Sequence, residues 1–141
     1  MRGPYKYELL PKYPHLSEAE SLIWNRFIVK HPQAFENCYY DVEVGECRPC
    51  EDKLSPSVEA DRQYLGRYKI DVIGETEAHY CIIEVKKEAT TKAMGEIWLY
   101  EQLFKDDWKP EKPVLLYIVT DTEMPNIRTV CEAEGVQVYV V

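Results

Sequence analysis

Apolar residues recur along the chain with two different periods, which divide it into helical and extended segments. Spacings of three and four residues predict helices over 17–31, 91–107 and 126–134. Alternation, or a short unbroken apolar run, predicts strands over 38–46, 68–74, 80–86, 114–120 and 136–141. The first helix also has a start signal, because Ser17 and Glu20 have the spacing of a capping box.

The predicted order of these segments is helix, three strands, helix, strand, helix, strand. Because strands and helices alternate in the second half, this order predicts an α/β fold in which helices flank a mixed β-sheet. Residues 48–66 hold two prolines and little periodicity, so they predict a long loop with a short helix near 58–64.

Two parts of the chain differ in composition. Residues 1–16 hold three tyrosines and three prolines and predict an extended N-terminal arm, whereas 17–141 predict a single domain. No stretch approaches the ~18 apolar residues of a membrane span, and the first residues lack the apolar run of a secretory signal. We therefore expect a soluble, cytoplasmic protein that does not bind membranes.

The cysteines predict reduced thiols, because the chain has five of them and no export signal. Cys47 and Cys50 form a C-x-x-C pair that, with Cys38, could hold zinc or an iron–sulfur cluster. No fourth thiol follows at metal-site spacing, and a strand end that runs into a proline turn is the alternative interpretation. Cys81 and Cys131 lie in apolar patterns typical of a core.

The formal net charge of −8 comes from 25 acidic and 17 basic residues. An acidic surface repels nucleic acid, which argues against a binding module that relies on a broad electrostatic footprint. A metal-dependent nuclease partly avoids this objection, because its carboxylates bind divalent cations that in turn contact the phosphate.

One polar cluster falls on the otherwise apolar strands 68–74 and 80–86. Alternation puts Glu84 and Lys86 on one face of the second strand, and a hairpin brings Asp71 close to Glu84. Such a cluster is costly to bury unless a metal or a substrate completes it. Carboxylate oxygens suit Mg²⁺ or Mn²⁺, which can activate water for phosphodiester hydrolysis, and Lys86 can orient or deprotonate that water and stabilise the phosphate.

The same residues resemble the active-site motif of the PD-(D/E)XK nuclease superfamily. The core of that family runs helix, three strands, helix, strand, with an Asp on the second strand and Glu-x-Lys on the third, which Asp71, Glu84 and Lys86 match. Ile70 stands where the family often has Pro. The resemblance covers about 17–141 and implies a restriction endonuclease-like fold and Mg²⁺- or Mn²⁺-dependent hydrolysis of DNA.

Further residues match features of the family and its subgroups. The family often has an acidic metal ligand in its first helix, and Glu20 is our choice because it lies on the apolar face, with helix capping as its alternative role. RecB-like and NucS-like members have Gly-Gln and then a Tyr in the second helix. Gly95 and Tyr100 match, but Glu96 replaces the Gln, so its carboxylate could extend the metal coordination or repel phosphate.

Basic residues close to the cluster in sequence are candidate phosphate contacts, with ordinary surface charge as the alternative. They are Arg67, Lys69, Lys87 and Lys92. Trp98 points away from the apolar face of its helix, which indicates a contact surface for DNA or a second subunit. Asp41 is either a further polar residue near the site or an exposed strand residue.

The sequence therefore predicts a metal-dependent deoxyribonuclease whose partner is DNA and which could work as a homodimer or within a larger complex. Three alternatives stay open: a dimeric resolvase of Holliday junctions or other branched DNA, a catalytically weak binding or assembly component with a nuclease fold, and a nuclease that acts on RNA. The segments LSEAESLIW, YYDVEVGE and IIEVKKEAT also resemble small proteins of phages and prokaryotic viruses, which implies a viral protein in the host cytoplasm.

Overall fold

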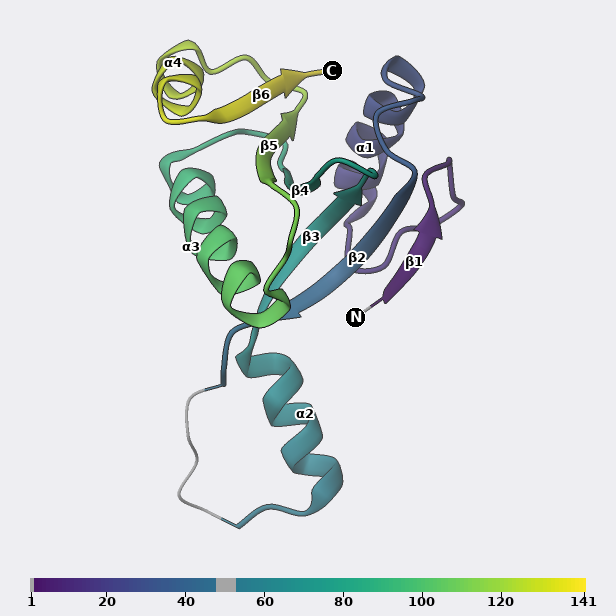
Figure 1. Ribbon diagram of the computed structural model, residues 1–141, viewed down its shortest axis with the longest axis vertical. Helices are drawn as coiled ribbons and strands as arrows, with labels where there is room; N and C mark the ends of the chain where they lie inside the picture. Colours follow the sequence, from purple (N-terminus) through teal and green to yellow (C-terminus); the bar gives the residue numbers. More distant parts are fainter. Residues whose placement is uncertain (1, 48–52) are drawn as a thin grey trace.

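The computed structural model describes residues 2–47 and 53–141, and these form a six-stranded mixed β-sheet with helices on both faces (Figure 1). The strands neighbour one another in chain order. They are β1 (Arg2–Lys6), β2 (Asn37–Val44), β3 (Tyr68–Glu75), β4 (Tyr80–Val85), β5 (Val114–Thr120) and β6 (Val136–Val140). Strands β1 to β4 are antiparallel, whereas β4, β5 and β6 are parallel. The predicted α/β class with a mixed sheet is confirmed.

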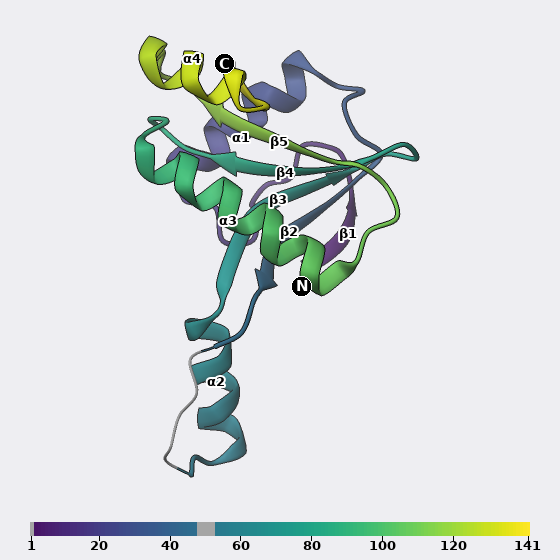
Figure 2. The ribbon, with the colours of Figure 1, turned by 60° about the vertical axis from the view of Figure 1, so that its left-hand side comes forward.

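The helices of the described residues are α1 (Glu18–Lys30), α2 (Pro56–Gly66), α3 (Thr91–Trp108) and α4 (Pro125–Ala133). Helix α1 packs on one face of the sheet together with the N-terminal segment, and α3 and α4 pack on the other face (Figure 2). In this part of the chain, no helix combines the length and the apolar character needed to cross a membrane.

The predicted helices and strands are present, with their ends shifted by one or two residues. Two elements go beyond the predicted order. Residues 2–6 of the expected arm pair with β2 and add a strand at the edge of the sheet. The short helix expected within 48–66 is α2, which has 11 residues and stands clear of the sheet (Figure 1).

Helix α1 begins at the predicted capping box. The Glu20 N–H donates to Ser17 Oγ (3.2 Å), and the Ser17 N–H donates to Glu20 Oε1 (2.9 Å). The buried residues of this helix are Ile23, Trp24, Phe27 and Ile28. Burial of such side chains stabilises the packed helix by roughly 1.5–3 kcal/mol each, which fixes the first turn of α1 relative to the sheet.

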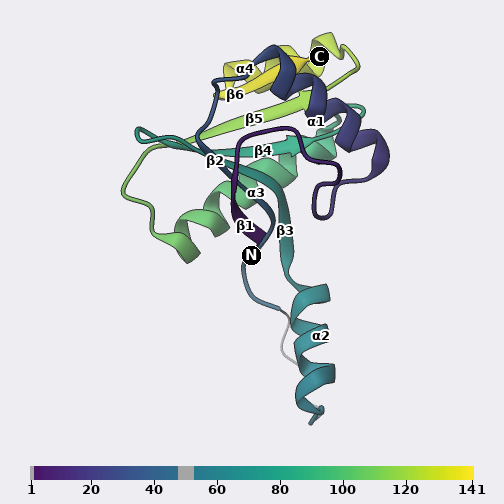
Figure 3. The same ribbon diagram turned by 90° about the vertical axis from the view of Figure 1, so that its right-hand side faces the viewer.

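Strands β2 and β3 both change the face to which their side chains point. In β2, Tyr40 packs with α1 and Val42 packs with α3, although residues two apart in a strand ordinarily share a face. In β3, Val72 packs with α1 whereas Ile70 packs with α3, so this strand changes face as well. The first part of β3, between α2 and this change of face, curves away from the body of the sheet (Figure 3).

Candidate active site

The hairpin of β3 and β4 brings two carboxylates together, as the sequence predicts. Pairing of Val72 with Ile83 puts Asp71 across from Glu84 at the next position. The Val85 N–H donates to Asp71 Oδ2 (3.0 Å), and the Asp71 N–H donates to Glu84 Oε1 (3.4 Å). Only 7% of Asp71 and 1% of Glu84 are exposed. At this end of the hairpin, hydrogen bonds to the carboxylates of Asp71 and Glu84 replace the backbone–backbone hydrogen bonds between β3 and β4.

Lys86 lies against this pair from just beyond the end of β4. Its Nζ is 3.4 Å from Glu84 Oε2 and 3.3 Å from Glu96 Oε2 on α3. The lysine side chain is 29% exposed, so it borders the solvent. The structure therefore gathers four of the predicted site residues into one cluster, with Asp71 and Glu84 inside and Lys86 and Glu96 toward the surface.

Burial and charge shift the pKa values of this cluster. Burial raises the pKa of Asp71 to about 6, opposed by Lys86 and by the hydrogen bond from Val85. Burial, followed by the charge of Asp71, raises the pKa of Glu84 well above its usual range. Burial alone would lower the pKa of Lys86, but the carboxylates of Glu84, Asp71 and Glu96 outweigh it and raise that pKa. Lys86 is therefore an ammonium ion at neutral pH, while the carboxyl pair binds protons more readily than exposed carboxyls.

Glu20 has the capping role that the sequence offered, and its charge also acts on the cluster. Its Oε1 accepts the Ser17 N–H in the capping box. Its charge also contributes to the raised pKa of Asp71, so the side chain lies within electrostatic reach of the cluster. The first turn of α1 thus adds negative charge on the side opposite to α3.

Helix α3 presents its first turns to the cluster. Tyr100 is buried, and its burial, followed by the charges of Glu84 and Glu96, raises its pKa, so the hydroxyl stays protonated. Gly95 is exposed, and a Cβ built on it would meet no atom within 4 Å. Packing therefore does not demand glycine at this position, and the surface beside Glu96 stays open.

Two buried carboxylates are a partial ligand set for a divalent cation. Mg²⁺ retains several waters and is commonly held by one or two protein carboxylates, so Asp71 and Glu84 fit its preferences. Within residues 2–47 and 53–141, no three His, Cys, Asp or Glu side chains form a ready-made metal site. A cation held by this pair would complete its coordination with water and substrate oxygens.

The cysteines that suggested a second metal site lie apart where they are described. Cys38 is buried near the start of β2, and burial raises its pKa to about 12, whereas Cys47 lies beyond the other end of that strand. Cys50 lies outside the described residues. Cys81 and Cys131 are buried in the core, as predicted.

Two of the predicted phosphate contacts, Lys87 and Lys92, are exposed. Lys87 is exposed directly after Lys86. Lys92 Nζ lies 3.7 Å from Glu96 Oε1, with 86% of its side chain exposed. Trp98, on the same helix, is 38% exposed and points outward as predicted. All three side chains are accessible to solvent, and Lys92 borders the cluster through its contact with Glu96.

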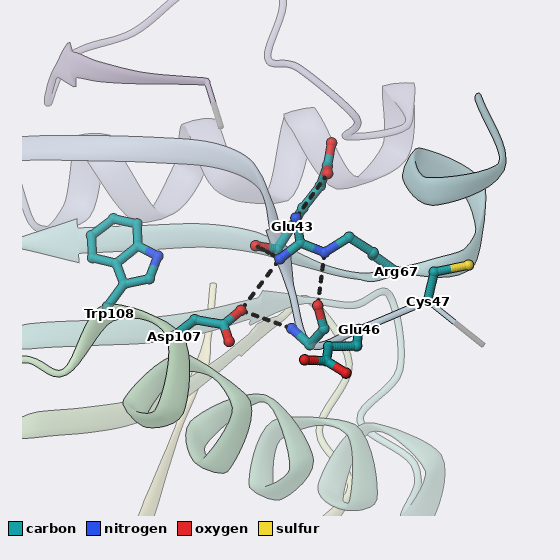
Figure 4. A pocket seen from close by; sticks show the side chains of 7 residues that line it. Glu43, Glu46, Cys47, Arg67, Asp107 and Trp108 are labelled. Carbon is teal, nitrogen blue, oxygen red and sulfur yellow. Dashed lines mark hydrogen bonds and ion pairs between the residues drawn. The ribbon is translucent and has the colours of Figure 1, made fainter. Parts of the chain in front are cut away.

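Arg67 has a structural role that the sequence did not reveal (Figure 4). Its Nε donates to the Gly45 carbonyl (2.8 Å), its Nη1 is 3.3 Å from Glu43 Oε2, and its Nη2 is 3.3 Å from Asp107 Oδ2. These contacts join the end of β2, the start of β3 and the last turn of α3. Lys69 Nζ donates to the Arg67 carbonyl (3.1 Å). The structure therefore engages the Arg67 side chain away from the carboxylate pair.

A hollow of about 800 Å³ adjoins Arg67 at the root of α2 (Figure 4). Its carboxylates, from Glu43, Glu46 and Asp107, outnumber the single guanidinium, so it does not suit a phosphate. Asp107 is 11 residues from Glu96 on α3, which at the helical rise is roughly 16 Å. The hollow is therefore separate from the carboxylate pair.

Asp41 is buried on β2 opposite Asp71, with 3% of its surface exposed. The exposed strand position that the sequence allowed for it is therefore wrong. His15 Nδ1 lies 3.6 Å from Asp41 Oδ1, and both residues have positive φ, 67° for His15 and 52° for Asp41. This contact was not predictable, because no local pattern in the sequence links the N-terminal segment to β2.

Similarity to known proteins is found at the level of structure. No family model and no curated protein matches the chain. A similar solved structure is a chain of the EndoMS–dsDNA2 complex, with a TM-score of 0.48 and 12% sequence identity. The similarity covers 94% of this protein and 48% of that chain, so this protein spans about half of its length. At this level the similarity concerns the course of the backbone and assigns no activity.

Proposed function

We propose that the protein is a nuclease that uses Mg²⁺ or Mn²⁺ to hydrolyse phosphodiester bonds in DNA. The observation that carries the proposal is the buried pair of Asp71 and Glu84, with Lys86 Nζ 3.4 Å from Glu84, on an otherwise apolar hairpin. Burying two carboxylates side by side costs free energy, and one ammonium group does not offset it. A divalent cation would restore the charge balance, which gives a physical reason for this arrangement.

The residues of the cluster can divide the reaction among them. Asp71 and Glu84 would hold the cation, with Glu20 adding negative charge beside them; the bound cation supplies an activated water and offsets charge on the phosphate. Lys86, kept protonated by the carboxylates around it, would donate to a phosphate oxygen and stabilise the charge that develops there. The protonated hydroxyl of Tyr100 is a second donor.

DNA is the substrate that we assign to this site. Lys92, which contacts Glu96, and Lys87, which follows Lys86 in the chain, are exposed and would contact backbone phosphates, while Trp98 offers an exposed ring for a further contact. The formal net charge of −8 opposes long-range attraction of DNA, so binding should depend on the cation and weaken with added salt.

The test is to incubate the purified protein with single-stranded, duplex and branched DNA, and with RNA, in Mn²⁺ or in EDTA. We expect Mn²⁺ binding in isothermal titration, cleavage of DNA with Mn²⁺ and no cleavage with EDTA. Cleavage confined to branched DNA by a dimer would identify a resolvase, and cleavage of RNA alone would reassign the substrate. Binding of Mn²⁺ and DNA without cleavage would favour a binding or assembly component. A protein that neither binds Mn²⁺ nor cuts contradicts the proposal.

Mn²⁺ affinity is expected to fall as the pH decreases through about 6. Burial raises the pKa of Asp71 to about 6 and raises that of Glu84, so below this pH the cation must displace protons. Each displaced proton lowers the apparent affinity about tenfold per pH unit. Exposed carboxylates, with pKa values near ~4, would keep their affinity to about pH 5. Titrations at about pH 7.5, 6.5 and 5.5 distinguish the two cases, and a constant affinity would count against a buried site.

A further inference from the structure

Asp41 has an unusual backbone conformation for a residue inside a strand. Its φ of 52° lies in the left-handed region that favours glycine and that Asp and Asn adopt more readily than other residues. Its neighbours keep their strand pairing, Tyr40 with Val72 and Val42 with Ile70. A residue is held in this region within a sheet only when the surrounding structure fixes it there, and such residues cluster at functional sites.

The positive φ coincides with the change of face in the sheet. Tyr40 precedes Asp41 and packs with α1, whereas Val42 follows it and packs with α3. The opposing strand β3 makes the same change directly across, between Val72 and Ile70. Because a regular strand keeps residues two apart on one face, both strands are turned at the level of the two opposing aspartates.

We propose that Asp41 is a positioning residue of the active site, which acts through Asp71. The change of face that it introduces removes Asp71 from the regular backbone hydrogen bonding between β3 and β4. The Asp71 carboxylate can then accept the Val85 N–H (3.0 Å), while its own N–H donates to Glu84 Oε1 (3.4 Å). The consequence for cation binding rests on the proposed function, but the placement of Asp71 can be measured without a cation.

Three substitutions at this position separate the effect of the backbone conformation of Asp41 from the effect of its carboxylate charge. Asp41→Asn and Asp41→Gly tolerate a positive φ, whereas Asp41→Val, with a β-branched side chain close in size to Asn, does not. All three remove the same charge. Mn²⁺ affinity in isothermal titration is expected to stay within about threefold of wild type for Asn and Gly, and to fall roughly 10–100-fold for Val.

The Val85 amide gives a second readout that needs no cation, because it donates to Asp71 Oδ2. Its hydrogen exchange should become about tenfold faster or more in Asp41→Val and stay unchanged in the Asn and Gly variants. The amide of Ile118, inside β5, is the control and should stay protected in all of them. If Asp41→Val does not fold, Asp41→Ala replaces it, since Ala also disfavours positive φ.

The readouts distinguish failure of this inference from failure of the proposed function. Wild-type protein that binds no Mn²⁺ contradicts the function, yet the Val85 amide still decides the role of Asp41. Wild-type behaviour of Asp41→Val overturns the positioning role. Equal losses in all three variants would show that the carboxylate itself is required. Faster exchange at both Val85 and Ile118 would reduce the role to general stability. His15→Ala should leave Mn²⁺ affinity unchanged, and a loss equal to that of Asp41→Val would assign the effect to His15 instead.

Discussion

The Asp71→Asn protein is expected to lose Mn²⁺ binding and DNA cleavage, and yet to be more stable than wild type in metal-free buffer at neutral pH. Burial raises the pKa of Asp71 from 3.8 to about 6, so the folded state binds a proton more tightly than the unfolded chain does. The contribution of Asp71 to wild-type stability should therefore be least favourable above pH ~6 and should become more favourable as the pH falls through 6 toward ~4. Asparagine is neutral throughout and can still accept the Val85 N–H. The gain at neutral pH should be about 2–3 kcal/mol.

Urea unfolding at about pH 7.5 and about pH 4.5, with EDTA present, measures this difference in the free energy of unfolding. The gain should be fully present at the higher pH and reduced to about a third at the lower one, because the unfolded chain still ionises most of this carboxyl at pH ~4.5. Asp106→Asn is the matched control, because Asp106 is exposed on α3 and its substitution removes the same charge from the surface. An Asp71→Asn protein that is less stable than wild type at both pH values, or that still binds Mn²⁺, would refute this account of the carboxyl pair.

Replacing Lys86 with alanine should slow DNA cleavage by about 10²–10³-fold while Mn²⁺ binding is largely kept. The ammonium group lies between Glu84 and Glu96 and is the charged donor nearest to the buried pair. Its loss would remove stabilisation of charge on the phosphate and would leave the carboxylates that hold the cation in place. Single-turnover cleavage at saturating Mn²⁺ and about pH 8, where the carboxyls are ionised, measures the effect on the chemical step.

Lys87→Ala is the control for this experiment, since it removes the same charge from the next residue, which is exposed. We expect it to weaken DNA binding slightly and to leave the single-turnover rate within about threefold of wild type. Equal cleavage by Lys86→Ala and wild type would mean that the activity comes from a contaminant or from other residues. An equal loss in both lysine variants would point to DNA binding rather than to catalysis.

Local patterns predicted most of the fold and the centre of the site. The capping box of Ser17 and Glu20 starts α1, and a short polar turn between two apolar strands defines the β3–β4 hairpin. Alternation within β4 then fixes Glu84 on the face of α3, and antiparallel pairing brings Asp71 across from it. Each of these features depends on residues close together in the sequence, where period and spacing are informative.

Features that depend on distant contacts were not predictable in this way. Strand β1 exists because Arg2–Lys6 pairs with β2, and β-pairing depends strongly on tertiary context. Arg67 looked like a phosphate contact because it precedes β3, but its partners Gly45 and Asp107 come from other elements. The positive φ of Asp41 is likewise invisible, since a strand pattern does not show which of its residues is turned.

Helix α2 stands clear of the sheet in two different views (Figures 1 and 2), so the molecule has an elongated outline. An elongated particle diffuses and tumbles more slowly than a sphere of equal mass. A sizing column should therefore overstate the mass of this protein, and a monomer could elute where a dimer is expected. Light scattering, which measures mass independently of outline, is the suitable method for distinguishing a single-copy nuclease from a two-copy resolvase.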